Sequence, residues 1–202
     1  MRDLCQHIMD LVENAVEAGA SEVTVSLNEE SARNCLSLQV DDNGPGLSEV
    51  ALQRGTDPFY TTRDTRRVGL GLSLIQAAAA RSGGSIFLDN QPEGGARVRC
   101  RFGLWHLDRP PLGDVPTTLL ALAVLHPQLD LVYRHVVDGR ELCIDLAAFR
   151  KSLNGAALAR SSSLSALKRF LEDRWQAFNN SAQPALETAG ANSRVNGKKC
   201  CA

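Results

Sequence analysis

Residues 3 to 18 distribute apolar and polar side chains with the period of an amphipathic helix. At about 100° per residue, the apolar side chains gather on one side of the helix and the polar ones on the other. Gly19 follows directly and is suited to end the helix. The apolar side consists of Leu4, Ile8, Leu11, Val12, Ala15 and Val16, and the polar side of Asp3, Gln6, His7, Asp10, Glu13, Asn14 and Glu17.

A second helical segment, residues 69–83, is flanked by stretches in which apolar and polar residues alternate every second position. Such alternation is typical of half-buried strands. The resulting order α-β-β-α-β-β predicts an α/β protein, a two-layer α/β sandwich whose sheet is mixed or antiparallel. The strands are expected at residues 21–27, 35–40, 85–90 and 96–104.

Residues 48–68 lie between the two halves of this pattern and show no clear periodicity. A loop of this length in a compact domain is typical of a functional lid or of a disordered segment. It contains the aromatic residue Phe59 and a basic run with Arg63, Arg66 and Arg67. We therefore expect it to serve function rather than the core.

A proline-rich joint at residues 106–114 leads into a small α-β-β-α extension. Its two strands flank Asp138-Gly139, a strong signal for a tight hairpin. One further helix is expected at residues 161–178, and the polar tail after it is expected to be disordered. We predict a first domain at 1–106, the extension at 107–155, and the helix with its tail at 156–202.

Charge and cysteine content narrow the class of protein. The 22 basic and 23 acidic residues nearly cancel, so nothing global favours nucleic acid or an anionic membrane as partner. The six cysteines form no C-x-x-C pair, which indicates reduced thiols in a cytosolic compartment. No apolar run approaches the length of roughly 18 residues needed to span a bilayer. We expect a soluble, cytoplasmic protein.

Asp10 and Asn14 are one turn apart on the polar side of the first helix. An amide oxygen is suited to Mg²⁺, which takes few protein oxygens when a phosphate supplies others. A carboxylate one turn away could activate a nucleophile. The alternative is an ordinary solvated helix face, because most amphipathic helices look like this.

Two glycine-containing stretches likewise allow either a ligand-binding or a purely structural interpretation. Asp42 ends a predicted strand and could accept a hydrogen bond from the amine of adenine, while Gly44 and Gly46 would let the backbone approach a flat base. The alternative is a plain Asn-Gly-Pro-Gly turn. Gly69 and Gly71 open a helix, where backbone amides can bind phosphate, although a lone G-x-G also serves simple helix packing.

Four motifs follow one another along the chain: DLVENAVEAGAS (10–21), DDNGPG (41–46), DPFYTT (57–62) and VGLGL (68–72). In this order they resemble the N box, first glycine box, F box and second glycine box of the GHKL ATP-binding fold. That fold is shared by histidine kinases, gyrase-type and mismatch-repair ATPases and heat-shock chaperones, and the resemblance covers residues 3 to about 103. The chain to about residue 154 also resembles stand-alone, histidine-kinase-like ATP-binding proteins of anaerobic bacteria.

The resemblance implies that ATP and Mg²⁺ are the cofactors. It assigns Mg²⁺ to Asn14, the adenine amine to Asp42, and general-base catalysis to Asp10, where many relatives carry a glutamate and histidine kinases usually an asparagine. Aspartate is one methylene shorter than glutamate, which puts the catalytic distance in question. The nucleotide-binding residues implied are Asn14, Asp42, Gly44, Gly46, Phe59, Thr61, Thr62, Arg63, Gly69, Leu70, Gly71 and Leu72.

Three departures from the family pattern matter. Arg67 stands where the second glycine box usually opens with glycine, and Ala96 replaces a threonine whose hydroxyl supports the adenine-binding aspartate. We therefore expect a weaker or water-mediated adenine site. The chain also starts at the N-box helix, so we expect neither a sensor domain nor a phosphoaccepting histidine, and His7 is expected to be structural or paired with aspartate.

Two functions of different class follow from the resemblance. In the first, the protein is an ATP-dependent kinase or ATPase that acts in signalling on or through a partner protein or phosphoacceptor. In the second, ATP binding without turnover switches a protein-binding surface, as in anti-sigma factors. A homodimer is compatible with either function, and a fold that binds no nucleotide is the third alternative.

Overall fold

A single six-stranded sheet runs through the protein in the order β3-β4-β2-β1-β5-β6. The computed structural model describes residues 3–56, 70–153 and 161–181. Only the parallel β1–β5 pair departs from antiparallel pairing, so the sheet is mixed, as predicted. The strands are β1 (Glu22–Glu30), β2 (Cys35–Asp42), β3 (Ser85–Asn90), β4 (Ala96–Gly103), β5 (Asp130–Val137) and β6 (Arg140–Asp145).

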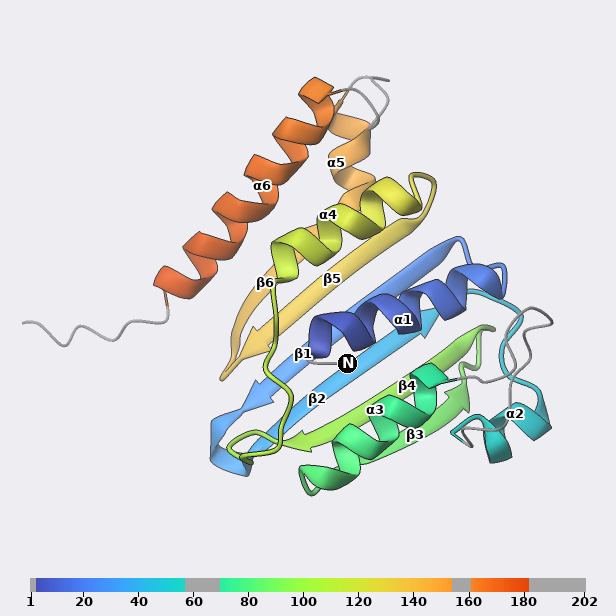
Figure 1. Cartoon of the computed structure of the whole chain (residues 1–202). Helices are drawn as coiled ribbons and strands as arrows, with labels where there is room; N and C mark the ends of the chain where they lie inside the picture. The colour runs from blue at the N-terminus through green and yellow to red at the C-terminus, as the bar shows by residue number, and fades with distance from the viewer. Residues whose placement is uncertain (1–2, 57–69, 154–160, 182–202) are drawn as a thin grey trace, which may run out of the picture.

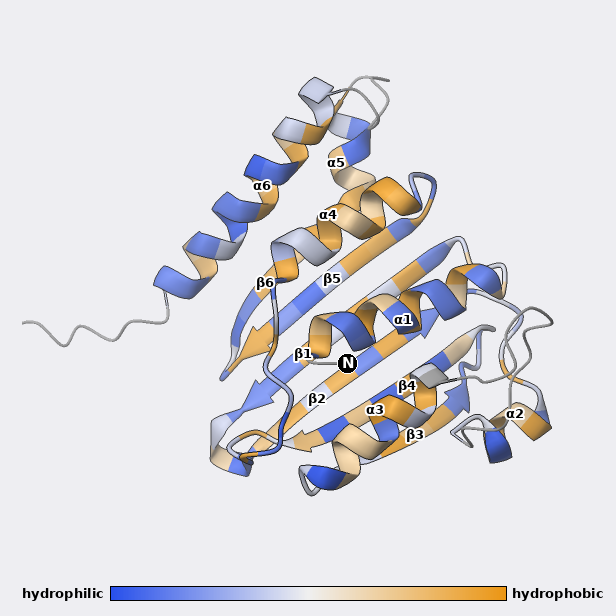
Figure 2. Cartoon of the chain, in the orientation of Figure 1, coloured by the Kyte–Doolittle hydropathy of each residue, from blue (hydrophilic) through white to orange (hydrophobic). Residues whose placement is uncertain are grey.

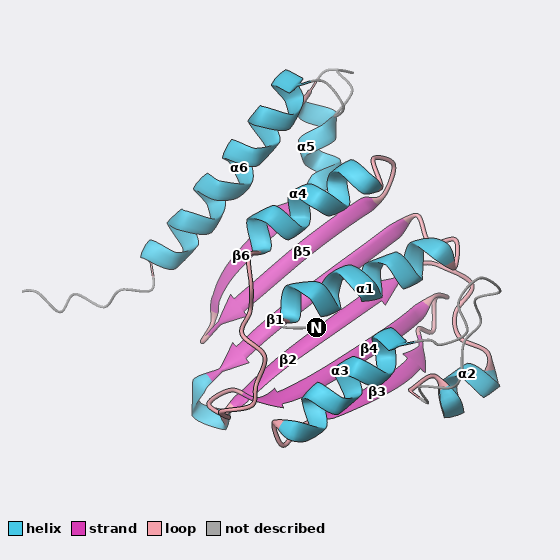
Figure 3. Ribbon diagram, in the orientation of Figure 1, coloured by secondary structure: helices cyan, strands magenta, loops and turns pink. Residues whose placement is uncertain are grey.

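Helices α1, α3 and α4 lie over one face of this sheet (Figures 1 and 3). Several helices start at a side-chain cap: Asp3, Asp114 and Asp145 each accept a hydrogen bond from a backbone N–H one turn into the helix. The helices are α1 (Leu4–Glu17), α2 (Glu49–Arg54), α3 (Leu70–Arg81), α4 (Val115–Leu125), α5 (Leu146–Ser152) and α6 (Ser161–Asn180), with a short 3-10 turn at Ser31–Arg33. The arrangement confirms the predicted two-layer α/β sandwich.

The core lies between the helices and the covered face of the sheet. Alternate residues of β1 and β2 are buried there, as the two-residue period requires. Figure 2 shows the same division as apolar and polar positions alternating along the strands. Fully or almost fully buried side chains include Val25, Leu38 and Tyr133 from the strands and Ile8, Val12, Ile75 and Leu119 from the helices.

The extension has the predicted α-β-β-α order, and its strands continue the same sheet. Strand β5 pairs in parallel with β1, with Val25 opposite Tyr133. Strand β6 then forms a hairpin with β5, turning at Asp138 and Gly139, both of which have positive φ. Strand β1 is therefore an interior strand. The division into units at residue 107 stays a prediction, since the sheet crosses it without interruption.

Helix α6 packs beside α4 and against β6. Its buried side chains are Ser163, Leu167, Leu171 and Phe178. Near its C-terminal end, Trp175 stacks on the buried His135 ring at 5.7 Å between centroids. Because α4 is apolar on most of its surface, it needs cover on more than one side, and the sheet and α6 provide it.

The structure departs from the sequence interpretation in two places. Helix α2 begins within the stretch 48–68, for which no periodicity was apparent, and Ser48 caps it by accepting from the N–H of Ala51. His7, assigned to the polar side of the first helix, is only 2% exposed. In the described ranges, no helix combines the length and apolar character needed to cross a membrane.

Candidate functional site

The polar side of α1 lies against the first turn of α3. A Cβ atom placed on Gly71 would be 3.2 Å from Oδ2 of Asp10 and 3.5 Å from Nδ2 of Asn14. The structure thus brings together residues from the first and last of the sequence motifs. Glycine at this position lets the backbone of α3 approach these two groups without a tight Cβ contact to the Asp10 carboxylate.

Apolar packing fixes this juxtaposition. Leu11, Val12 and Ala15 anchor α1 on the sheet, and Ile75, Ala78 and Ala79 do the same for α3. The alanines keep the facing side chains small, so the two helices can pack closely. Asp10 and Asn14 are partly buried as a result. The N–H groups in the first turn of α3 have no acceptor within the helix and can serve an anion.

Asp42 is held at the end of β2 by backbone donors. Its Oδ1 accepts hydrogen bonds from the N–H of Gly44 at 2.8 Å and from the N–H of Ala96 at 3.2 Å. A carboxylate has about four lone-pair positions, so the group keeps capacity to accept from an amine. A threonine at position 96 would offer the same backbone N–H, so this contact does not replace the missing hydroxyl, and the weaker or water-mediated adenine site stays a prediction.

Asn43 ties the turn after β2 to the start of β1. Its Oδ1 accepts from the N–H groups of Ser21 and Glu22, each at 2.9 Å, and its Nδ2 donates to Oγ of Ser21 at 3.0 Å. A Cβ atom on Gly44 would lie 3.7 Å from that of Ala20, which follows α1 directly. These contacts place the glycine turn beside the C-terminal end of α1, the end that carries Asn14.

Gly46 has a structural reason to be glycine. Its φ is +79°, and a Cβ atom would lie 2.9 Å from Oδ1 of Asn90. Asn90 in turn accepts from the N–H of Leu47 at 2.7 Å and donates to its carbonyl at 2.9 Å. The plain-turn interpretation therefore accounts for Gly46 by itself, whereas the approach of Gly71 to Asp10 and Asn14 has no such turn to explain it.

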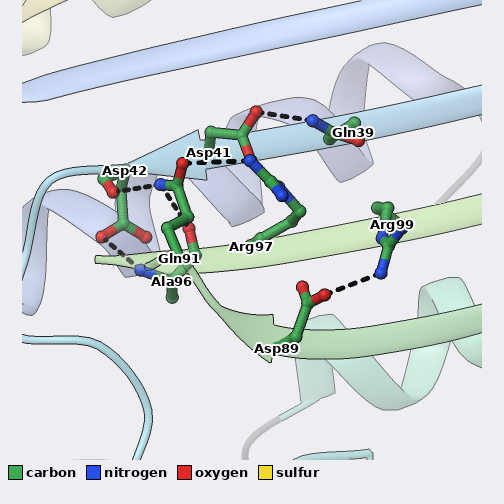
Figure 4. A network of polar contacts seen from close by, with 8 residues as sticks. All are labelled: Gln39, Asp41, Asp42, Asp89, Gln91, Ala96, Arg97 and Arg99. Carbon is green, nitrogen blue, oxygen red and sulfur yellow. Dashed lines mark hydrogen bonds and ion pairs between the residues drawn. The ribbon is translucent and has the colours of Figure 1, made fainter. Parts of the chain in front are cut away.

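A polar network reaches Asp42 from the open face of the sheet, the face opposite the helices (Figure 4). Nε2 of Gln91 donates to the backbone carbonyl of Asp42 at 2.8 Å, and Oε1 of Gln91 accepts from Nη2 of Arg97 at 3.1 Å. The sequence analysis did not single out Gln91, which lies between two predicted strands, at 85–90 and 96–104. The available signal was the alternation of β4, which places Arg97 on the polar face.

Several ionisable groups in the core are held uncharged. Burial lowers the pKa of His7 from 6.5 to about 4, and its Nδ1 has no hydrogen-bond partner within the described part of the chain. Burial likewise raises the pKa of the Cys5 thiol to about 11 and that of Cys100 to about 12. These thiols stay protonated near neutral pH and are poor nucleophiles.

Some predicted site residues cannot be placed. Phe59, Thr61, Thr62, Arg63 and Gly69 lie outside the described residues, as do Arg66 and Arg67. Of the remaining members of the second glycine box, Leu70 starts α3 and Leu72 packs against the core. Among the residues that the structure describes, no three His, Cys, Asp or Glu side chains converge as a metal-binding group.

Among known proteins, this chain is similar to parts of sensor kinases. The chain is 43% identical over 65 residues to the C4-dicarboxylate transport sensor protein DctB of Pseudomonas aeruginosa, covering 32% of this chain and 11% of that protein. It is 39% identical over 93 residues to the signal transduction histidine-protein kinase AfsQ2 of Streptomyces coelicolor, covering 44% and 17% respectively. The chain therefore spans less than a fifth of the length of either relative.

Two solved structures are similar to this chain over about half of its length. The ATP-binding domain of PrrB from Mycobacterium tuberculosis is 30% identical, with 48% of this chain and 64% of that chain covered and a TM-score of 0.38. The catalytic domain of the histidine kinase ThkA is 26% identical with the same coverage and a TM-score of 0.40.

The family profile is more extensive than any of these pairwise matches. The profile described as "Histidine kinase-, DNA gyrase B-, and HSP90-like ATPase" matches residues 1–106, which include the whole of the site built from α1, β2, α3 and β4. The chain belongs to this ATPase family, with a nucleotide-binding domain of the type found in histidine kinases.

Proposed function

We propose that the protein binds Mg-ATP beside the C-terminal end of α1 and uses it as a kinase or ATPase acting on or through a partner protein. The observation that carries the proposal is the approach of Gly71 to Asp10 and Asn14, which brings the first and last of the family motifs together. Family membership supplies the ligand class. The names of the relatives, sensor and signal-transduction kinases, support a regulatory role. A cytoplasmic location is part of the proposal.

Each residue has a role in this proposal. The Asp42 carboxylate accepts the adenine amine while Gly44 and Gly46 leave room for the base. The backbone amides at Gly71, in the first turn of α3, receive the phosphates. Phe59, Thr61, Thr62, Arg63, Gly69, Leu70 and Leu72 enter as nucleotide-binding residues on the family pattern alone.

The donors at the site fit Mg²⁺. The amide oxygen of Asn14 is a hard ligand, and a single protein oxygen suffices where a nucleotide supplies phosphate oxygens. When bound, the metal neutralises charge on the phosphates. The absence of a Cβ on Gly71 keeps the space beside Asn14 open. Asn14 is therefore our choice for the metal-binding residue.

Asp10 is the proposed general base. It lies one turn before Asn14 on the same side of α1, so it would face a water or a partner's hydroxyl placed near the terminal phosphate. It is partly buried and close to the backbone of Gly71, which limits its freedom to turn away. Because aspartate is one methylene shorter than glutamate, a second function stays open: a nucleotide-dependent switch without turnover. Either function is compatible with a monomer or a homodimer.

Labelled ATP distinguishes these functions. The protein is incubated with γ-labelled ATP and Mg²⁺, and label is followed to free phosphate, to protein, or nowhere. We expect Asp10→Ala to lower turnover at least about 100-fold while ATP binding is retained. Glu13→Gln, which removes another carboxylate from the same helix, is the control and should keep turnover. ATP binding without any transfer of label would support the switch, and absence of ATP binding would refute both functions.

A further inference from the structure

Pairing between β2 and β4 stops one residue before the residue proposed to bind adenine. The two strands are paired from Cys35 opposite Gly103 to Asp41 opposite Arg97, whereas Asp42 is paired only on its other side, with Val23 of β1. The Asp42 carboxylate accepts from the N–H of Gly44 in its own turn and from the N–H of Ala96 on β4. The second of these contacts depends on how firmly the ends of β2 and β4 are held together.

Gln91 holds those ends together with its side chain. Its Nε2 donates to the carbonyl of Asp42 at 2.8 Å and lies 3.4 Å from the carbonyl of Ala96. One amide group thus bridges the residue that carries the carboxylate and the residue that donates to it. Gly95 makes this approach possible, because a Cβ atom there would lie 1.8 Å from the Asp42 carbonyl oxygen.

Arg97 determines which end of the Gln91 amide faces Asp42. Its Nη2 donates to Oε1 of Gln91 at 3.1 Å, which leaves Nε2 for the Asp42 carbonyl. If the Gln91 amide were rotated by 180°, its Oε1 would face the carbonyl oxygen of Asp42 and its Nε2 would face the Nη2 donor of Arg97. Arg97 is itself fixed, since its Nε donates to Oδ1 of Asp41 at 2.5 Å and Gln39 donates to the other oxygen of that carboxylate at 2.6 Å (Figure 4).

We propose that Gln91 and Arg97 are positioning residues for base recognition, acting on Asp42 from the open face of the sheet. They would not touch the nucleotide. Their effect is to keep the Asp42 carboxylate where it meets the purine amine, so they set selectivity for adenine and leave the affinity for phosphate unchanged. This inference rests on the proposed function, in which Asp42 binds adenine.

The chain contains a matched control for the arginine. Arg99 lies two residues along β4 on the same face and pairs with Asp89 at 2.7 Å, with side-chain exposures of 47% and 40%. The Arg97–Asp41 pair differs in its link to Gln91, and its side chains are 30% and 17% exposed. Replacing each arginine by methionine removes one charge and one ion pair from the same strand.

The test measures ADP and inosine diphosphate binding by calorimetry for the full chain and for Arg97→Met and Arg99→Met. Inosine has an oxo group where adenine has its amine. Loss of one positioning hydrogen bond should weaken ADP binding by Arg97→Met about fivefold and leave inosine diphosphate binding unchanged. Arg99→Met should match the wild type. Equal ADP affinities for the two variants would overturn the inference, as would equal losses for both nucleotides in Arg97→Met.

The variant Gln91→Met serves as a second test, because Arg97→Met leaves Asp41 without its ion pair and could fail to fold. The same loss of adenine selectivity is expected, because the hydrogen bond to Asp42 is removed directly. In the double variant the loss should equal that of Gln91→Met alone, since Arg97 acts through Gln91. Fully additive losses would contradict this route. A wild-type protein that binds neither nucleotide would instead refute the proposed function and the inference with it.

Discussion

The backbone of Gly71 and the carboxylate of Asp10 are near neighbours: a methyl group on Gly71 would lie 3.2 Å from Oδ2 of Asp10. The two residues belong to different helices, and their contact joins the start of α3 to the polar side of α1. A methyl group added at Gly71 should affect stability and activity in opposite directions, so the role of the contact can be tested.

Gly71→Ala should separate folding from catalysis. Alanine is the better helix residue by roughly 0.5–1 kcal/mol, so the free energy of unfolding should stay the same or rise. The new methyl group must displace the Asp10 carboxylate by a few tenths of an ångström, and ATP turnover should fall about tenfold. Urea denaturation and phosphate release measure the two quantities.

Gln76→Ala, an exposed change in the same helix, is the control for helix propensity and should leave turnover intact. Unchanged turnover in Gly71→Ala would show that the position of Asp10 does not limit the reaction.

Two neighbouring glycines should respond very differently to alanine. Gly94 and Gly95 both have positive φ, +99° and +91°, so each substitution strains the backbone by about 1–2 kcal/mol. A Cβ on Gly94 meets nothing within 4 Å, whereas on Gly95 it would lie 1.8 Å from the Asp42 carbonyl oxygen. We expect Gly95→Ala to lose at least about 2 kcal/mol more than Gly94→Ala in urea denaturation. Similar losses would mean that the β3–β4 turn adjusts freely.

His7 should make the protein acid-sensitive. Its pKa is about 4 in the folded protein and 6.5 as the ordinary value. Between these values the unfolded chain binds more protons, so the free energy of unfolding falls as the pH decreases from 6.5 toward 4. For one fully buried imidazole the loss is of the order of 3 kcal/mol at pH 4.

The variant His7→Leu removes this contribution and should give a flatter profile of unfolding free energy against pH between 4 and 7. It also removes the buried Nδ1 that has no partner in the described part of the chain, so no large loss is expected at pH 7. Parallel profiles for variant and wild type would show that His7 does not titrate differently on unfolding.

Asn14→Ala should abolish the dependence of ATP affinity on Mg²⁺. With Asn14 present, chelating the metal with EDTA is expected to weaken ATP binding about tenfold, since the metal links the phosphates to the protein. In the variant, the affinities with and without metal should agree within error in isothermal titration. A variant that still responds fully to Mg²⁺ would remove Asn14 from the metal site.

The order of helices and strands was predictable because each long element carries its own period. The alternation in β1 and β2 and the helical period of α1 appear directly in the residues. Helix α2 was missed since its six residues are too few to show a period, and only Ser48 at its start signals it. The burial of His7 was not predicted because the helix period gives a direction around α1 but not the positions of α3 and α4, the helices that contact α1.

The hydrophobic pattern could not predict which strands pair with each other, and the reason is different. The alternation in β5 says that one side of the strand is buried, without saying that its neighbour is β1. In the site, Asp10, Asn14, Asp42 and Gly71 were identified from local motifs. Gln91 and Arg97 were not, because their importance lies in cross-strand register, where Asp41 stands opposite Arg97.

The parallel pairing of β5 with β1 has a consequence for anyone who wishes to isolate the nucleotide domain. Cutting the chain after residue 106 would remove β5 from β1 and expose the strand edge along which eight residues, Glu22 to Glu29, are now paired. It would also take Leu119 and Leu122 away from the apolar core. Such a fragment would offer a template for strand addition by another copy, so we expect it to self-associate more readily than the full chain.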